Sequence, residues 1–118
     1  MDDSSASAEA AAAGGPLADG RSASAPETVL QIVRGHRLGM VIGERTGGTN
    51  GNVASFQVPG GYTVRFTGMR AVNHDGSLLH GKGIDPDVPV AVTVAGTIAG
   101  RDEVLDAAVE MLASEREP

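Results

Sequence analysis

The stretch S-A-S-A-P-E-T-V-L-Q-I-V, residues 22–33, predicts the start and body of an amphipathic helix. Ser24 occupies a plausible N-cap position, and Glu27 follows at the spacing of a capping box. Pro26 suits the first helical turn, where its missing N–H costs nothing. An apolar stripe at helical spacing follows: Val29, Leu30, Ile32 and Val33. Gly35 is expected to end the helix, since the basic residues after it suit the negative end of the helix dipole.

Apolar segments on both sides of this helix predict strands. Leu17–Gly20 is interpreted as the end of one strand, and Leu38–Ile42 as a short buried strand that stops at Gly43. A strand, a helix and a second buried strand in this order are typical of an α/β layered fold.

The rest of the chain predicts short strands and one more helix. Phe56–Val58 and Tyr62–Phe66 flank Pro59-Gly60-Gly61, which is typical of a hairpin. Three further segments are expected: a short strand at Met69–Val72, an alternating apolar segment at Val88–Val94 and a helix at Asp102–Ser114. The intervening stretches, Glu44–Asn52 and Gly81–Asp87, consist largely of turn residues and are expected to be loops.

Composition limits the domain organisation. The 118 residues allow one small domain or a piece of a larger one. Hydrophobic residues make up 41% and aromatic residues only 3%, so the core must be aliphatic. Residues 1–15 are rich in Ser, Ala and Gly with no large apolar residue after Met1, which predicts a disordered tail before a domain at 16–115. No internal repeat is present.

Charge and residue usage exclude several classes of protein. The formal net charge of −6, with no basic cluster, argues against nucleic-acid binding. No apolar run is long enough for a transmembrane helix, and residues 1–15 do not resemble a signal peptide. The absence of cysteine removes disulfides, thiol nucleophiles and cysteine-based metal sites. We expect no metal and no cofactor.

Ser24 is the candidate nucleophile. A serine at the first turn of a helix lies near unpaired N–H groups and the positive end of the dipole, which stabilise an oxyanion. The alternative from spacing alone is that Ser24 only caps the helix, because capping serines are common.

The other candidates have simpler structural interpretations. His36, His74 and His80 could each act as a general base, but they form no zinc-binding pattern and suit surface or loop positions. Lys82 lies between two glycines, where burial that would lower its pKa is hard to argue. Gly47-Gly48 and Asn50-Gly51 lack a phosphate-binding pattern. Asp85 and Asp87, which flank Pro86, suit a turn better than an acid/base pair.

Three motifs in order carry a family resemblance: S-A-S-A-P-E, then V-I-G-E-R-T-G-G, then L-H-G-K-G-I-D-P-D-V-P-V. Together they resemble the tail-specific or C-terminal-processing serine peptidases, family S41, over roughly Leu17–Val92. The resemblance implies a ClpP/crotonase-like α/β fold and hydrolysis of peptide bonds in polypeptide substrates. It places Ser24 on the nucleophile of the family, with Ala25, Gly47 and Gly48 as candidates for oxyanion or substrate contacts.

The chain departs from the family pattern in ways that imply a partial catalytic domain. The Gly-rich loop at 47–51 has no lysine, which makes the chain closer to the tricorn-like branch, whose base is a histidine before the serine. No histidine precedes Ser24, and no PDZ-type module or upstream glycine-rich oxyanion segment is found. We therefore expect the C-terminal half of a catalytic domain, with the base supplied from elsewhere. Glu27 and Glu44 are expected to be structural, as cap and loop anchor, and residues 46–52 to line the site.

Two other interpretations remain open from the sequence. The chain could be a non-catalytic binding protein on the same scaffold, as the retinoid-binding repeats resembling this family suggest, or a truncated product without its own function. The strand edge near Leu38–Ile42 would invite self-association of an isolated half. Localisation is not indicated, although relatives are often exported.

Overall fold

The computed structural model describes residues 14–114. Its elements, in chain order, are β1 (Leu17–Ala18), α1 (Ala25–Gly35), β2 (Ile42–Gly43), β3 (Val53–Val58), β4 (Tyr62–Thr67), β5 (Val88–Pro89), α2 (Val94–Ile98) and α3 (Glu103–Ser114). Nearly all of the predicted tail, residues 1–15, lies outside the described residues. No helix within residues 14–114 is long and apolar enough to cross a membrane.

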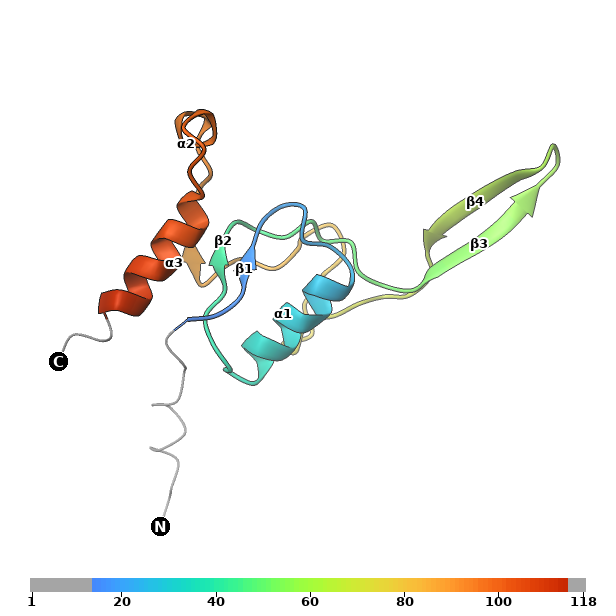
Figure 1. Cartoon of the computed structure of the whole chain (residues 1–118). Coiled ribbons are helices and arrows are strands. Elements are labelled where there is room, and N and C mark those ends of the chain that lie inside the picture. Colours follow the sequence, from blue (N-terminus) through green and yellow to red (C-terminus); the bar gives the residue numbers. More distant parts are fainter. Residues whose placement is uncertain (1–13, 115–118) are drawn as a thin grey trace, which may run out of the picture.

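Three short parallel strands form the centre of the fold. Their order is β1–β2–β5, with Leu17 opposite Ile42 and Ile42 opposite Val88. Helix α1 lies on one side of this sheet and α3 on the other (Figure 1). This arrangement confirms the predicted α/β layered fold.

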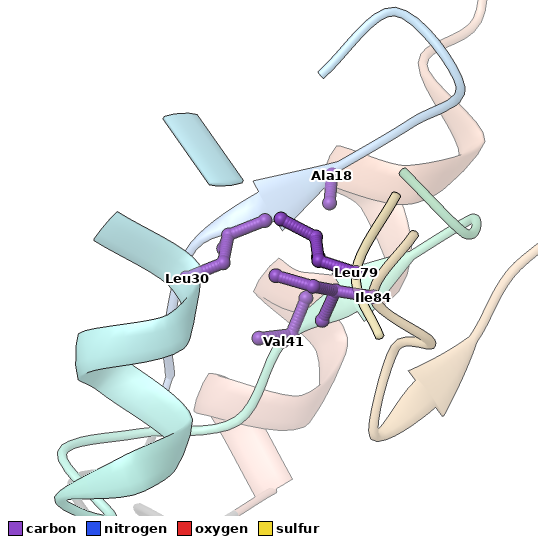
Figure 2. Packing of buried hydrophobic residues seen from close by; sticks show 5 residues of the cluster. All are labelled: Ala18, Leu30, Val41, Leu79 and Ile84. Carbon is purple, nitrogen blue, oxygen red and sulfur yellow. The ribbon is translucent and has the colours of Figure 1, made fainter. Parts of the chain in front are cut away.

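Two apolar clusters cover the two faces of the sheet. The first is formed by Ala18, Leu30, Val41, Leu79 and Ile84, whose side chains converge beneath α1 (Figure 2). The second joins Ile42 to Val104 and Ala108 of α3. Successive side chains of an extended strand point to opposite faces, so neighbouring Val41 and Ile42 each serve one cluster. All of these residues are aliphatic, as the composition predicts.

The predicted hairpin is confirmed and is longer than expected. β3 and β4 pair antiparallel over six residue pairs, from Val53 opposite Thr67 to Val58 opposite Tyr62. The hairpin projects far from the sheet and helices (Figure 1). Every residue of both strands is exposed or half-buried.

The predictions for the helices are confirmed to within a residue or two. α1 begins directly after Ser24 and ends at Gly35, and α3 covers nearly all of the expected Asp102–Ser114. The strand prediction at Leu38–Ile42 was wrong in its bounds. Arg37 has a φ of 53°, and the Leu38 N–H still donates to the Val33 carbonyl of α1. The chain becomes extended only after Leu38, and the strand covers Ile42–Gly43.

Two further strand predictions also need correction. Met69–Val72 forms no strand but only an isolated bridge between Val72 and Leu78, because its carbonyls bond to the Leu79 N–H and to the Gln31 side chain instead of a neighbouring strand.

The segment Val88–Val94 is extended only at its start. Thr93 is the N-cap of α2, its hydroxyl accepting the Gly96 N–H at 2.9 Å, so Val94 begins a short helix that the alternating pattern did not reveal.

Candidate active site

The three sequence motifs meet around the carboxylate of Glu27. This side chain is fully buried. Oε1 accepts the Thr46 hydroxyl at 2.6 Å and the Gly48 N–H at 2.7 Å. Oε2 accepts the N–H groups of Ser24 and Thr49, each at 3.1 Å. Glu27 thus confirms its predicted role as a cap of α1, and it also ties the start of α1 to the loop after β2.

The third motif packs against the same loop. The Gly81 N–H donates to the Gly48 carbonyl at 2.8 Å, and the Ile84 N–H donates to the Thr46 hydroxyl at 2.8 Å. Gly48 has a φ of 71°, and a Cβ added there would lie 2.6 Å from the Gly83 nitrogen. A Cβ added at Gly83 would likewise collide with the Thr46 carbonyl oxygen. The close crossing of the two loops therefore requires glycine at positions 48 and 83.

Thr46 was expected only to line the site with the rest of residues 46–52, whereas the structure makes it a buried link between Glu27 and Ile84. Its side chain is buried, and its hydroxyl both donates to Glu27 and accepts from Ile84. The loop holds a second threonine, Thr49, which is exposed, so residue type alone could not have identified Thr46. A hydroxyl suits this position because it is donor and acceptor at once.

Ser24 has an unusual backbone conformation, with φ at 63° and ψ at −121°. A non-glycine residue in this region costs on the order of 1–3 kcal/mol and is held there only by its surroundings. Here the surroundings are two acceptors of its N–H, the Thr49 carbonyl at 2.9 Å and the Glu27 carboxylate. Its hydroxyl faces the Glu27 backbone in the capping-box arrangement but makes no side-chain cap hydrogen bond.

The backbone N–H of Ala25 follows Ser24 at the N-terminus of α1. Both residues are exposed, and no acceptor for this N–H exists among residues 14–114. By contrast, the Gly47 N–H donates to the Ser22 carbonyl at 2.9 Å, and the Gly48 N–H to Glu27. Of the predicted oxyanion residues, Ala25 therefore offers a donor, whereas Gly47 and Gly48 use theirs to shape the loop.

Two of the three histidines lie away from Ser24. His36 caps the opposite end of α1, about 18 Å from Ser24 at 1.5 Å per residue. The His74 ring packs edge-on against His36, with ring centroids 5.6 Å apart. Neither can reach the Ser24 hydroxyl within this chain.

His80 and Lys82 flank Gly81 and so belong to the loop that packs on Gly48. Both are exposed. Lys82 lines a groove of about 650 Å³ that runs along α1 past Gln31 and Arg34. Within the described part of the chain, no imidazole or amine hydrogen-bonds to the Ser24 hydroxyl.

Three other acidic residues near the site bond to neighbouring segments of the chain and stabilise the loops. Asp85 pairs with Arg45 at 2.6 Å, and Asp87 accepts the Val41 N–H at 2.8 Å. Glu44 accepts the Val92 N–H at 3.1 Å. These contacts confirm the structural interpretation of all three residues.

Comparison with known proteins identifies the family. Residues 5–90 match the sequence profile of peptidase family S41. The chain belongs to this family. The match covers all three motifs around Glu27 and ends close to β5, so the family region includes the whole candidate site.

Individual relatives agree with this membership. A protein of Staphylococcus haemolyticus named "Probable CtpA-like serine protease" is 34% identical over 70 residues, which cover 59% of this chain and 14% of that protein. A crystal structure of a protein from Parabacteroides merdae, described as a "putative peptidase", has a TM-score of 0.71 at 34% identity, covering 81% of this chain and 30% of the other. The tricorn protease shares the fold, with a TM-score of 0.73 at 22% identity over 84% of this chain and 10% of its own. The S41 member described here thus spans a minor part of its relatives' length.

Proposed function

We propose that this S41 family member contributes the nucleophile of a serine peptidase acting on polypeptide substrates. The observation that carries the proposal is the conformation of Ser24, which is strained, exposed and held by a buried carboxylate. Strained residues at a helix start are typical of catalytic nucleophiles, whereas a residue that merely caps a helix needs no positive φ.

In the proposed reaction, the Ser24 Oγ attacks the carbonyl carbon of the scissile peptide. A C–O bond forms, and the hydroxyl proton passes to a general base. The Ala25 N–H and the N-terminus of α1 stabilise the negative carbonyl oxygen. The base returns its proton to the leaving amine as the C–N bond breaks. Water then hydrolyses the acyl-enzyme and restores the serine.

The general base is proposed to come from outside the described residues, either from other parts of a longer polypeptide or from a second chain. His36 and His74 are too far from Ser24, and neither His80 nor Lys82 bonds to its hydroxyl. A serine without its base loses most of its rate advantage, so weak activity is expected from this chain alone.

A different observation, the Ala25 N–H without an acceptor among residues 14–114, favours a second candidate, a non-catalytic binding protein on the peptidase scaffold. In that case, the Ala25 N–H and the helix start would bind a carboxylate or carbonyl of a ligand without cleaving it. The two candidates differ in whether the Ser24 oxygen is nucleophilic.

Labelling with a fluorophosphonate probe distinguishes them. Such a probe phosphonylates an activated serine oxygen and needs no substrate. We expect slow labelling that Ser24→Ala abolishes and Ser22→Ala retains, because the Ser22 hydroxyl bonds to Asp19, and the Ser22 carbonyl that accepts the Gly47 N–H is kept in the variant. No labelling of the folded chain, even with upstream segments of a longer relative added in trans, would overturn the peptidase proposal and leave the binding protein.

A further inference from the structure

The projecting hairpin has one wholly apolar face. In a paired ribbon, alternate residues of each strand share a face with their cross-strand partners. The register therefore places six apolar residues together: Ala54, Phe56, Val58, Tyr62, Val64 and Phe66. The Phe56 and Phe66 rings meet edge-on at 6.2 Å between centroids. The opposite face is largely polar: Val53, Ser55, Gln57, Thr63, Arg65 and Thr67. We call the first set the apolar hairpin face.

Within the described residues, this face remains open to solvent. Tyr62 is 72% exposed, Phe56 52% and Phe66 50%. An isolated two-stranded hairpin is marginally stable in water and needs a surface to pack against. The hairpin lies far from both apolar clusters (Figure 1), so neither can supply that surface.

We propose that the apolar hairpin face packs against the same face of a second copy of this chain. The apolar hairpin face carries no charged residue, because the one charge of the two strands, Arg65, lies on the opposite face, although the chain as a whole has a net charge of −6. Two copies can therefore meet here without bringing like charges together. The absence of charge also gives no basis for selecting an acidic or basic partner.

In the proposed dimer, the two hairpins are related by a two-fold axis perpendicular to their strands. It sets the hairpins antiparallel, so that the two bodies lie at opposite ends and do not collide. Each hairpin is about 20 Å long for six residues, so the tip of one copy reaches the base of the other. A notch of about 450 Å³ lies at this base, and its lining residues are Thr67, Gly68, Met69, Arg70, Leu78 and His80. Tyr62, next to the tip, is placed to enter the notch of the partner and contact the Met69 sulfur.

The surface available is close to what a specific dimer needs. At about 200 Å² per aromatic side chain, the exposed fractions leave roughly 350 Å² of aromatic surface per copy. The aliphatic residues of the face, with half-exposed Met69 and Leu78 in the notch, raise this to about 600 Å². Two copies would bury about 1,200 Å² in total, the lower limit for stable specific interfaces, which predicts a weak dimer in the micromolar range.

Disulfide trapping tests the arrangement directly, because the chain has no cysteine of its own. Tyr62→Cys and Met69→Cys are prepared as separate proteins, mixed and mildly oxidised. We expect a cross-linked heterodimer in at least tenfold excess over a control mixture of Thr63→Cys and Met69→Cys, since Thr63 points from the opposite face. Equal cross-linking in the two mixtures would overturn the proposed arrangement.

Sedimentation velocity across the micromolar range tests the association itself. Phe56→Ser is expected to weaken the dimer on the order of 100-fold. Val53→Ser removes a more exposed apolar side chain from the other face and is expected to change the dissociation constant less than about threefold. A chain that stays monomeric throughout, or a dimer equally sensitive to both substitutions, would refute the second copy as the occupant of this face.

Discussion

Replacing Glu27 with glutamine tests the central contact of the site. The substitution keeps the size and shape of the side chain and exchanges one carboxylate oxygen for an NH₂ group. Each oxygen of Glu27 accepts two hydrogen bonds, so the new NH₂ meets two donors whichever way the amide turns. The side chain is fully buried, and water cannot replace the lost acceptor.

The cost follows from the more favourable of the two orientations. With the NH₂ toward the Ser24 and Thr49 N–H groups, the amide oxygen still accepts from Thr46 and Gly48, and Ser24 still donates to the Thr49 carbonyl. The buried NH₂ itself and the Thr49 N–H are then left without acceptors. A buried unsatisfied group costs about 1–3 kcal/mol, and bonds that lose their charged partner weaken as well. We therefore expect Glu27→Gln to lower the free energy of unfolding by about 3 kcal/mol, a large part of a typical small-domain stability.

Urea denaturation followed by far-ultraviolet circular dichroism measures this difference, since the chain has no tryptophan for fluorescence. Glu44→Gln is the matched control. Glu44 accepts a single backbone N–H through Oε1, which an amide oxygen can replace, so a loss below about 1 kcal/mol is expected. A Glu27→Gln protein within about 0.5 kcal/mol of the parent would show that this carboxylate does not hold the site together.

Two further predictions concern positions outside the central contact. Hydrogen bonds from the backbone N–H and then the hydroxyl of Thr93 hold the pKa of Glu103 below its usual range. The contribution of these hydrogen bonds to the stability of the fold is therefore present above the pKa of Glu103 in the unfolded chain and is lost as the pH falls through its pKa in the folded protein. In Thr93→Val, which lacks the hydroxyl, an NMR titration should show that the titration midpoint of Glu103 has moved upward. An unchanged Glu103 midpoint would contradict the role of the Thr93 hydroxyl. Gly83→Ala should lower the thermal midpoint more than Gly76→Ala, because both glycines have positive φ but only an added Cβ at Gly83 meets backbone atoms; equal losses would mean that the close crossing of the two loops is not limiting.

Much of the fold could be predicted because the local sequence signals for capping and turns favour the same helix and hairpin that the tertiary structure contains. The Ser24-to-Glu27 spacing and the apolar stripe set the helix start, and the Pro-Gly-Gly turn sets the hairpin. Strand bounds were less predictable. Met69–Val72 has strand-like residues but no strand beside it, and ladder pairing depends on what the rest of the chain brings near.

The sequence predicted which residues form the candidate site, but it did not predict their conformation or their contacts. The motifs indicated Ser24, Glu27 and the glycine loop, and these do lie together. Neither the positive φ of Ser24 nor the double role of the Thr46 hydroxyl could be read from the sequence, because both result from contacts between segments about 20 or more residues apart along the chain.

The alternation of Val41 and Ile42 between two cores restricts how the segment before β2 can evolve. Because side chains of a strand alternate, a one-residue slip of Val41 and Ile42 along the neighbouring strands would move each side chain into the wrong cluster. Substitutions at exposed Leu38 do not touch either cluster. Homologous segments are therefore expected to keep apolar residues at both Val41 and Ile42, and a small residue at Gly39, where an added Cβ would lie 2.8 Å from the Gly14 carbonyl oxygen.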